Sequence, residues 1–289
     1  MRRALVLGGS RFIGRHLVDR LLAEGTAVTI ATRGRTRDPF GEAVRRLVVD
    51  RSDAGALVAA VRGQDWDLCF DQVCFDGPSA RAAIQALAGR VGRVVLTSSA
   101  TVYPFGDGTR VESDFDAAAH PASSLPARTL GYEEGKRQAE TAWSSAPGVR
   151  LVAVRLPMIL GDDDPTGKLS ELAALRRAGR PLPVANPDCP TSWLGVDEAA
   201  RFLTWAASSA LEGPVNACSD EAASLRTMVG WLDAELGTKG ALDDGPMRPG
   251  LVRIALPGAL VMSNAKARAA GWSFAPLAAW LPPLLRALR

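Results

Sequence analysis

Residues 3–18 have the sequence RALVLGGSRFIGRHLV, and this stretch decides how the rest of the chain is interpreted. Four apolar residues lead directly into Gly8 and Gly9, and apolar residues with helical spacing begin at Phe12. This order is typical of a buried parallel strand that passes through a phosphate-binding loop into a helix. The two glycines permit a tight turn beside a pyrophosphate, and Gly14 lets the helix pack closely on the strand.

The spacing of these glycines leaves a second interpretation open. Gly8 and Gly14 fit the pattern G-x-x-G-x-x-G, but Arg11 stands where the middle glycine is expected. A glycine turn that merely joins a strand to a helix would have the same pattern. We therefore treat cofactor contact as a prediction, assigned to Gly8, Gly9, Ser10, Arg11, Phe12, Ile13 and Gly14.

Apolar strands alternate with amphipathic helices over the first half of the chain. The predicted strands are 27–31, 46–50, 67–74, 93–97 and 149–154, and the predicted helices are 12–23, 53–62, 76–90 and 130–144. This alternation predicts an α/β fold with a doubly wound parallel sheet, the Rossmann arrangement. Because such sheets bind ligands beyond the carboxyl ends of their strands, we expect one rim to carry Gly8, Thr32, Asp71 and Ser99.

Two further motifs carry a family resemblance. Tyr132 and Lys136 form Tyr-x-x-x-Lys, and Ser-Ser-Ala-Thr-Val-Tyr covers residues 98–103. With the glycine loop, Arg-Leu-Pro at 155–157 and Trp-Leu-Gly-Val-Asp at 193–197, the chain resembles the extended short-chain dehydrogenase/reductases, the NAD(P)-dependent epimerase/dehydratase family. The loop itself is similar to the atypical branch of that family, some members of which are thought to bind RNA or to have lost catalysis.

The resemblance implies a domain organisation and further cofactor contacts. It implies a Rossmann domain over 1–156 and a smaller, mainly substrate-binding domain over 157–289, from which about 193–218 return to the main sheet. The cofactor contacts that it implies are Asp50 and Arg51 beside the adenine, Asp71 and Gln72 beneath the ribose, Lys136 at the nicotinamide ribose, and Pro157.

The end of the second predicted strand favours NADP over NAD. Residues 32–35 are Thr-Arg-Gly-Arg, with no acid to hold the ribose 2′-hydroxyl of NAD. A guanidinium group suits a 2′-phosphate, which a carboxylate would repel. We therefore predict NADP, with Thr32, Arg33, Arg35 and Arg11 at the phosphate. NAD is the alternative cofactor, and a solvated basic loop is the alternative interpretation.

Tyr132 and Lys136 are the predicted catalytic pair. Four residues apart on a helix, they share one face. A free tyrosine has a pKa near ~10, and a nearby ammonium group stabilises the phenolate, so Tyr132 is the predicted general acid–base group. By the resemblance, Ser99 hydrogen-bonds the substrate oxygen. The predicted reaction is hydride transfer between nicotinamide and a carbonyl or hydroxyl carbon of a polar, sugar-like small molecule. An ordinary surface pair is the alternative.

The reaction class is narrowed by the residues after Ser99. Dehydratases of the family carry acids there, whereas this chain has Ala100 and Thr101, so reduction, oxidation or epimerisation is expected. The alternative function is a catalytically silent family member that binds RNA or senses NAD(P), suggested by Arg11 and by the arginines between 33 and 46. The net charge of only +3 and the lack of interleaved aromatics argue against nucleic acid.

Composition favours a cytoplasmic protein of bacterial origin. The apolar run after the first arginines is too short for a signal peptide, and no stretch is long enough to span a membrane. Family members are often dimers, so a homodimer is expected. We expect no metal site, because the four cysteines, predicted to be buried free thiols, lack ligand spacing; they are Cys69, Cys74, Cys189 and Cys218.

Four local expectations complete the sequence-based interpretation. The long segment 104–130 is predicted to be a functional loop or lid, with His120 exposed to solvent in it. Residues 162–164, three aspartates, are predicted to form a solvated turn. The tryptophans of the C-terminal tail, 251–289, are expected in the core.

Overall fold

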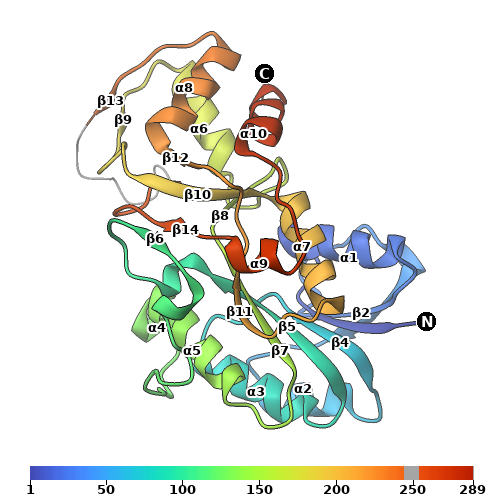
Figure 1. The fold of residues 1–289 in the computed structure, drawn as a ribbon. Helices are drawn as coiled ribbons and strands as arrows, with labels where there is room; N and C mark the ends of the chain where they lie inside the picture. The colour runs from blue at the N-terminus through green and yellow to red at the C-terminus, as the bar shows by residue number, and fades with distance from the viewer. Residues whose placement is uncertain (244–253, 289) are drawn as a thin grey trace.

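The computed structural model describes residues 1–243 and 254–288, and its centre is a seven-stranded parallel sheet (Figure 1). The strand order is β11-β7-β5-β4-β1-β2-β3. The strands are β1 (Arg3–Leu7), β2 (Ala27–Thr32), β3 (Val44–Val48), β4 (Trp66–Asp71), β5 (Val91–Ser99), β7 (Leu151–Leu156) and β11 (Gly213–Asn216). The predicted α/β fold with a doubly wound parallel sheet is confirmed.

Helices cover both faces of the sheet and create two cores. On one face α1 (Phe12–Ala23) packs against α7 (Val196–Ser208), over a core that includes Val6, Leu17 and Phe202. On the other face lie α2 (Ala54–Val61), α3 (Gly77–Leu87) and α5 (Tyr132–Ser144), over Leu5 and Trp143. The sheet is therefore buried on both sides, which explains the continuous apolar runs of its strands.

Four predicted strands have edges that differ from the structure by two residues or more. Strand β5 covers 91–99 instead of 93–97, β7 covers 151–156 instead of 149–154, and β3 and β4 both end early. The sequence predicts 46–50, but β3 ends at Val48 because the Asp50 carboxylate accepts the N–H of Ser52 at 3.0 Å and its hydroxyl at 2.7 Å, which makes a turn. The sequence also predicts 67–74, but β4 ends at Asp71. The ladders of β4 with both neighbouring strands end at Asp71, opposite Leu7 of β1 and Leu96 of β5.

The second part of the chain forms a smaller unit, drawn above the main sheet in Figure 1. It contains the sheet of β8 (Met158–Leu160), β10 (Pro190–Gly195) and β12 (Ala222–Ser224), the pair β9 (Leu182–Pro183) and β13 (Leu242–Asp243), and the helices α6 (Lys168–Arg177), α8 (Leu225–Leu236) and α10 (Leu277–Arg286). Of residues 193–218, β11 joins the main sheet and α7 covers it, whereas residues 193–195 belong to β10. Residues 244–253 and 289 of the predicted second domain lie outside the described residues.

The long segment after β5 contains short elements. They are η2 (Ala100–Val102), β6 (Thr109–Arg110), η3 (Glu112–Asp114) and α4 (Ala127–Leu130), and β6 pairs with β14 (Val261–Met262), which precedes α9 (Ala265–Ala269). The remaining short helix is η1 (Gly41–Ala43). Over the described ranges no helix is both long enough and apolar enough to cross a bilayer.

Candidate functional site

The glycine loop between β1 and α1 is as tight as its sequence predicts. Gly8 and Gly9 have φ values of +106° and +100°, which an L side chain rarely adopts. A Cβ on Gly14 would lie 2.8 Å from the nitrogen of Gly9, so only glycine lets the helix start this close to the turn. The loop also holds Phe12 in the left-handed region at φ 44°. Strain of this kind persists only where the surrounding structure requires it.

Two features of this loop fit a dinucleotide. The N-cap residue of α1, Arg11, makes no side-chain cap, and the first turn has no acidic residue, so helix N–H groups remain for an anion. Beside the loop, both amide atoms of Gln72 are buried without a hydrogen-bond partner among the described residues. A Cβ on Gly8 would lie 3.3 Å from the Cβ of Gln72. These residues would therefore suit a pyrophosphate and a ribose hydroxyl.

An open groove of about 480 Å³ adjoins the loop. Its lining includes Ser10, Arg11, Arg15 and Arg37. The Nε of Arg11 donates a hydrogen bond to the Thr36 hydroxyl across 2.9 Å, which holds this arginine against the segment after β2. The departure from the glycine pattern at position 11 thus places a guanidinium at the wall of the groove.

Of the residues predicted to bind the 2′-phosphate, Thr32, Arg33 and Arg35 lie at the end of β2. Arg33 and Arg35 are exposed, and both lower the pKa of Asp50, although the hydrogen bonds from Ser52 lower that pKa more. The hydroxyl of Thr32 accepts the N–H of Gly34 at 3.3 Å. Arg33, Arg35 and Asp50 therefore share one corner of the sheet, on the side where the strands end.

The side chains of Arg51 and Asp71 form an ion pair with each other inside the protein. Arg51 donates to both carboxylate oxygens of Asp71, with one bond of 3.0 Å, and to the Ser79 carbonyl at 3.0 Å. The indole of Trp143 donates to the same carboxylate at 3.2 Å, and Asp71 is fully buried. Any contact of Asp71 with a cofactor is therefore limited to its main chain. Pro157, between β7 and β8, is half-buried.

Ser99, the last residue of β5, has a hydroxyl with a defined orientation. Its oxygen accepts the N–H of Thr101 at 3.2 Å and the Thr101 hydroxyl at 3.0 Å. Two hydrogens approach this oxygen, so the hydrogen of Ser99 itself remains to be donated elsewhere. Ser99 can thus donate to an oxygen atom of a ligand at this rim.

Lys136 is a buried residue of α5 that joins strand β5 to the segment after β4. It is 3% exposed, and its Nζ donates to the carbonyls of Cys74 and Thr97, each at 2.9 Å. Its third N–H has no acceptor among the described residues, and the ammonium lies 4.9 Å from the centre of the Phe75 ring. No carboxylate within the described ranges forms an ion pair with it, so its positive charge is available to a neighbouring anion.

Tyr132 is the first residue of α5 and is 46% exposed. Its hydroxyl has no hydrogen-bond partner in the part of the chain that the structure describes, and its ring lies 6.4 Å from that of Phe75. Tyr103, the second of the two tyrosines, is fully buried, and burial raises its pKa to about 12. Tyr132 is therefore the tyrosine that can meet a ligand.

Sequence reasoning missed Phe75 and Gly135. A Cβ on Gly135 would lie 2.4 Å from the carbonyl oxygen of Phe75, so glycine inside α5 lets the segment after β4 approach the helix. This approach brings the Phe75 ring close to both Tyr132 and Lys136. A glycine within a predicted helix was the available signal, because such a glycine often marks a close packing contact.

The expectation for His120 is wrong, and the expectation for residues 162–164 is only partly met. His120 is not exposed to solvent, because its Nε2 lies 2.8 Å from a carboxylate oxygen of Glu134 and its ring packs edge-on against Phe115. Residues 162 and 163 do form a turn, as expected, but the aspartates of this stretch are not merely solvated. Asp163 pairs with Arg15 and His16 of α1, and Asp164 pairs with Lys168. The partner of His120 and the partners of Asp163 lie outside the local pattern, which explains both differences.

All four cysteines are free, and three are buried, whereas Cys189 is half-buried. Burial raises the pKa of Cys74 and Cys218 to about 12, so these thiols are not reactive at neutral pH. In the tail, Trp272 packs among Phe202, Trp205 and Phe274.

The sequence of this chain is similar to those of two known proteins. A 2′-dehydrokanamycin reductase from Streptomyces kanamyceticus is 33% identical over 208 residues, which cover 70% of this chain and 56% of that protein. The chloroplast stem-loop binding protein of 41 kDa b from Arabidopsis thaliana is 28% identical over 218 residues, covering 70% and 54%. The chain thus spans about half the length of these two relatives.

The fold is similar to that of UDP-glucose 4-epimerase from Thermus thermophilus, solved in complex with NAD. The TM-score is 0.80, the identity is 21%, and 99% of each chain is covered. The sequence pattern of the NAD dependent epimerase/dehydratase family matches residues 4–218. The resemblance in the sequence is therefore confirmed, and the chain belongs to the NAD dependent epimerase/dehydratase family.

Proposed function

We propose that this protein is an NADP-dependent oxidoreductase that transfers hydride to or from a carbonyl or hydroxyl carbon of a polar, sugar-like molecule. The observation that supports the proposal is Lys136, a buried cation without a carboxylate partner among the described residues. It hydrogen-bonds Thr97, two residues before Ser99, and lies one helical turn after the exposed Tyr132. The glycine loop lies at the same edge of the sheet, since β1 and β5 are parallel members of it.

Each residue of this group has a distinct role in the proposal. The nicotinamide, when bound, supplies or accepts the hydride. Ser99 donates its free hydroxyl hydrogen to the substrate oxygen and holds it near Tyr132. Tyr132 gives a proton to that oxygen in reduction and takes it in oxidation. The charge of Lys136 stabilises the phenolate, and its third N–H suits the ribose of the cofactor.

NADP is proposed as the preferred cofactor because arginines stand where an acid would select NAD. Arg11 and Arg37 line the groove beside the loop, and Arg33 and Arg35 lie at the end of β2. The family description and the Thermus structure name NAD, so the preference has to be measured directly. The substrate class is supported by the names of the reductase and the epimerase, which refer to a dehydrokanamycin and to UDP-glucose.

The test has two stages. Titration of the purified protein with NADPH and NADH, followed by the change in nicotinamide fluorescence, is expected to give at least about tenfold tighter binding of NADPH. Reduction of 2′-dehydrokanamycin and epimerisation of UDP-glucose then serve as probe reactions with the bound cofactor. A protein that binds neither dinucleotide would end the proposal, and equal affinities would end the NADP part of it.

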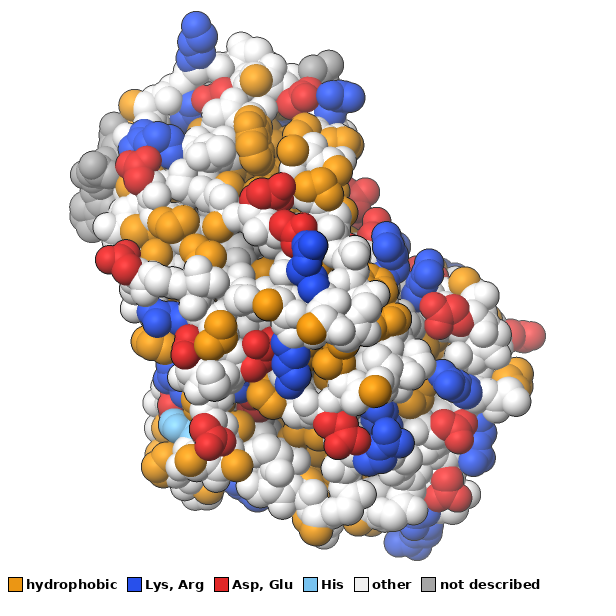
Figure 2. Space-filling view, in the orientation of Figure 1, with side chains coloured by type: hydrophobic (Ala, Val, Ile, Leu, Met, Phe, Trp, Pro, Cys, Tyr) orange, Lys and Arg blue, Asp and Glu red, His pale blue; other side chains and the backbone are white. Residues whose placement is uncertain are grey.

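RNA binding is the second candidate, favoured by the similarity to the stem-loop binding protein of Arabidopsis. Two observations weigh against it. On the face shown in Figure 2, basic and acidic side chains are interspersed rather than separated. Arg46 is also neutralised by Asp38, and Arg15 by Asp163. Gel shifts with a stem-loop RNA at two salt concentrations would support this candidate only if binding falls steeply with salt.

A further inference from the structure

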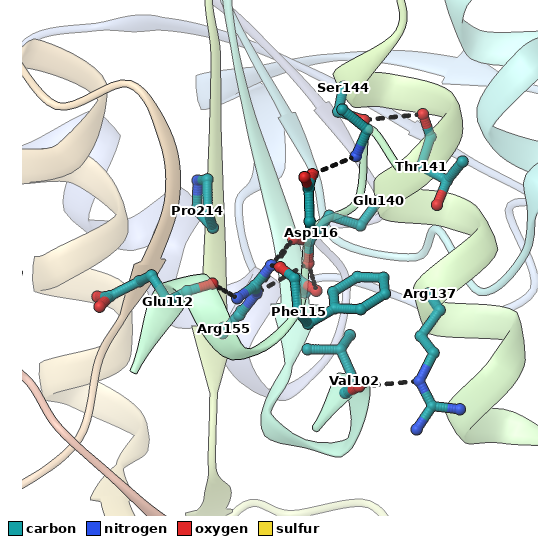
Figure 3. A network of polar contacts seen from close by, with 12 residues as sticks. Val102, Glu112, Phe115, Asp116, Arg137, Glu140, Thr141, Ser144, Arg155 and Pro214 are labelled. Atoms are coloured by element: carbon teal, nitrogen blue, oxygen red, sulfur yellow. Dashed lines mark hydrogen bonds and ion pairs between the residues drawn. The ribbon is translucent and has the colours of Figure 1, made fainter. Parts of the chain in front are cut away.

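Arg155 and Glu140 form an ion pair in the interior of the protein. Arg155 is 0% exposed and Glu140 is 1% exposed. The Nε of Arg155 donates to the two carboxylate oxygens at 3.0 and 3.2 Å, and its Nη2 also contacts Oε1. Figure 3 shows the guanidinium with the loop residue Glu112 on one side, and with the loop residue Phe115 and the α5 residue Glu140 on the other.

Glu140 links helix α5 to the end of strand β5. It lies one helical turn after Lys136, and its Oε2 accepts the hydroxyl of Ser98 at 2.6 Å. Ser98 directly precedes Ser99 on β5. The carboxylate therefore holds the strand that carries Ser99 against the helix that carries Tyr132.

Through Glu140, Arg155 also links helix α5 and the end of strand β5 to the segment that follows β5. Its Nη1 donates to the carbonyl of Glu112 at 2.7 Å and to the Tyr103 hydroxyl at 2.8 Å, and its Nη2 donates to the carbonyl of Phe115 at 2.9 Å. The Tyr103 hydroxyl in turn donates to the side chain of Asn216 on β11 at 2.7 Å. The loop of residues 103–115 is thus fastened to the sheet at three of its residues.

An ion pair is not the arrangement that stability alone would select here. The desolvation of two charges can exceed their attraction, and well-packed apolar residues of similar volume are often as stable or more stable. What apolar residues cannot supply is a set of directed hydrogen bonds that sets the strand end, the helix and the loop relative to one another. Each of the three guanidinium nitrogens of Arg155 donates to an acceptor on the helix, on the loop or on Tyr103.

We propose that Glu140 and Arg155 are positioning residues. They hold Ser99, Tyr132 and the loop of residues 103–115 in fixed positions relative to one another. The inference rests on the proposed function, because it names what aligns the groups of that site. Neither side chain reaches the rim itself. Both act through Ser98 and through the loop carbonyls.

The experiment separates positioning from stability with two variants and one control. The double variant Glu140→Leu/Arg155→Met removes the pair but keeps apolar volume. Ser98→Ala keeps the pair and removes its link to the strand end. The control is Thr141→Val on the same helix, because the Thr141 hydroxyl is buried without a hydrogen-bond partner among the described residues.

Two readouts are measured beside the melting temperature. The first is turnover of 2′-dehydrokanamycin and UDP-glucose, with NADPH affinity measured separately. The second is the spectrum of protein with ¹³C-labelled tyrosine, which contains signals from Tyr103 and Tyr132 only. Tyr103 contacts Arg155 and is expected to shift in the double variant whatever its role. Tyr132 contacts neither residue of the pair, so its signal reports positioning.

If the pair positions the site, the double variant melts near the wild type, its turnover falls about 100-fold, NADPH affinity changes little, and the Tyr132 signal moves. Ser98→Ala is expected to show the same losses to a smaller degree, and Thr141→Val none of them. A stable double variant with unchanged turnover and an unmoved Tyr132 signal would overturn the inference. If the double variant does not fold, Ser98→Ala decides by the same readouts. If the wild type turns over neither probe, the proposed activity on those probes fails, and the Tyr132 signal still decides the positioning role.

Discussion

The ammonium group of Lys136 donates a hydrogen bond to the carbonyl of Thr97 across 2.9 Å. Thr97 lies two residues before Ser99 on β5, and Lys136 lies one turn after Tyr132 on α5. One buried cation therefore joins the strand and the helix that carry the two groups proposed to meet the substrate. The same cation lacks a carboxylate partner in the described part of the chain, which leaves its charge to act on the site.

Replacement of Tyr132 by phenylalanine removes the proposed acid–base group and little else. The ring packs near Phe75 in either protein, and no hydrogen bond of the hydroxyl is lost within the described residues. We expect turnover of the probe substrates to fall by about 10²–10⁴-fold, with NADPH affinity and melting temperature nearly unchanged. Steady-state kinetics and fluorescence titration measure the two quantities. Unchanged turnover would remove Tyr132 from the mechanism.

Lys136→Met is expected to differ from Tyr132→Phe in NADPH affinity and in stability, because the carbonyls of Cys74 and Thr97 lose their buried donor. The methionine keeps the apolar volume of the lysine stem but supplies no N–H and no charge, so the cofactor loses a charged hydrogen bond. We expect NADPH to bind about tenfold more weakly, in addition to a loss of turnover. Titration of both variants side by side provides the comparison. Equal NADPH affinity in the two variants would contradict the ribose contact.

Arg11→Gly restores the middle glycine of the loop pattern and removes a guanidinium from the groove wall. If Arg11 contacts a 2′-phosphate, the ratio of NADPH to NADH affinity is expected to fall about 10-fold or more at low salt. The matched control is Arg45→Ala, since Arg45 is exposed but lines a different groove with Arg3 and Gln64. A ratio that moves equally in both variants would show a general charge effect instead.

Asp71→Asn tests whether Asp71 acts through its side chain in the core. The change leaves the Arg51 guanidinium without its carboxylate in a largely buried position. We expect the free energy of unfolding to fall by about 3 kcal/mol in urea titrations. The control is Asp53→Asn, which also removes a carboxylate but keeps a good N-cap for α2, so its expected effect is close to zero.

Glu134, in the first turn of α5, binds His120 of the segment between β5 and α5. We expect this carboxyl group to make the stability of the protein depend on pH. Burial acts to raise its pKa, but hydrogen bonds from Gln138, His120 and Arg137 outweigh this, so the pKa lies below its ordinary value. A carboxyl group with a lower pKa in the folded state stabilises the protein above its unfolded pKa. That contribution is lost as the pH falls through the folded-state pKa.

The corresponding variant is Glu134→Gln. We expect it to lower the free energy of unfolding at neutral pH by about 1 kcal/mol, a modest value because the group is partly exposed and screened. The difference from the wild type is expected to vanish in acid, once the wild-type carboxyl is protonated. Glu133→Gln, at an exposed neighbouring position, is the control. A difference that persists in acid would exclude the carboxylate as its source.

Local patterns predicted the elements that depend on neighbours in the sequence. Helix α1 covers the predicted residues, 12–23, because its apolar spacing and the glycine after it are both local signals. Asp53, the first residue of the predicted helix 53–62, caps α2 and accepts the N–H of Ala56 at 2.9 Å. The end of β4 was predicted wrongly because its pairing with both neighbouring strands stops at Asp71, and this pairing joins residues that are distant in sequence.

The residues of the candidate site also divide into those that local motifs predicted and those that only the folded structure revealed. Its glycines, Ser99, Tyr132 and Lys136 were visible as motifs, since each motif occupies a short stretch. That Arg51 is turned inward to Asp71, and that His120 is bound to Glu134, could not be predicted, because each pairing is made across the fold. Phe75 was missed for the same reason: only packing brings its ring to Lys136.

The sequence by itself determined the fold class, the family and the motifs that could carry chemistry, because these depend on residue type, order and local spacing. The tertiary structure alone decided which charged side chains are available to a ligand and which form ion pairs or hydrogen bonds inside the protein. An arginine looks the same in a sequence whether it lies on a groove, like Arg11, or in the core, like Arg155. Only the positions of distant carboxylates and carbonyls, set by packing, distinguish the two.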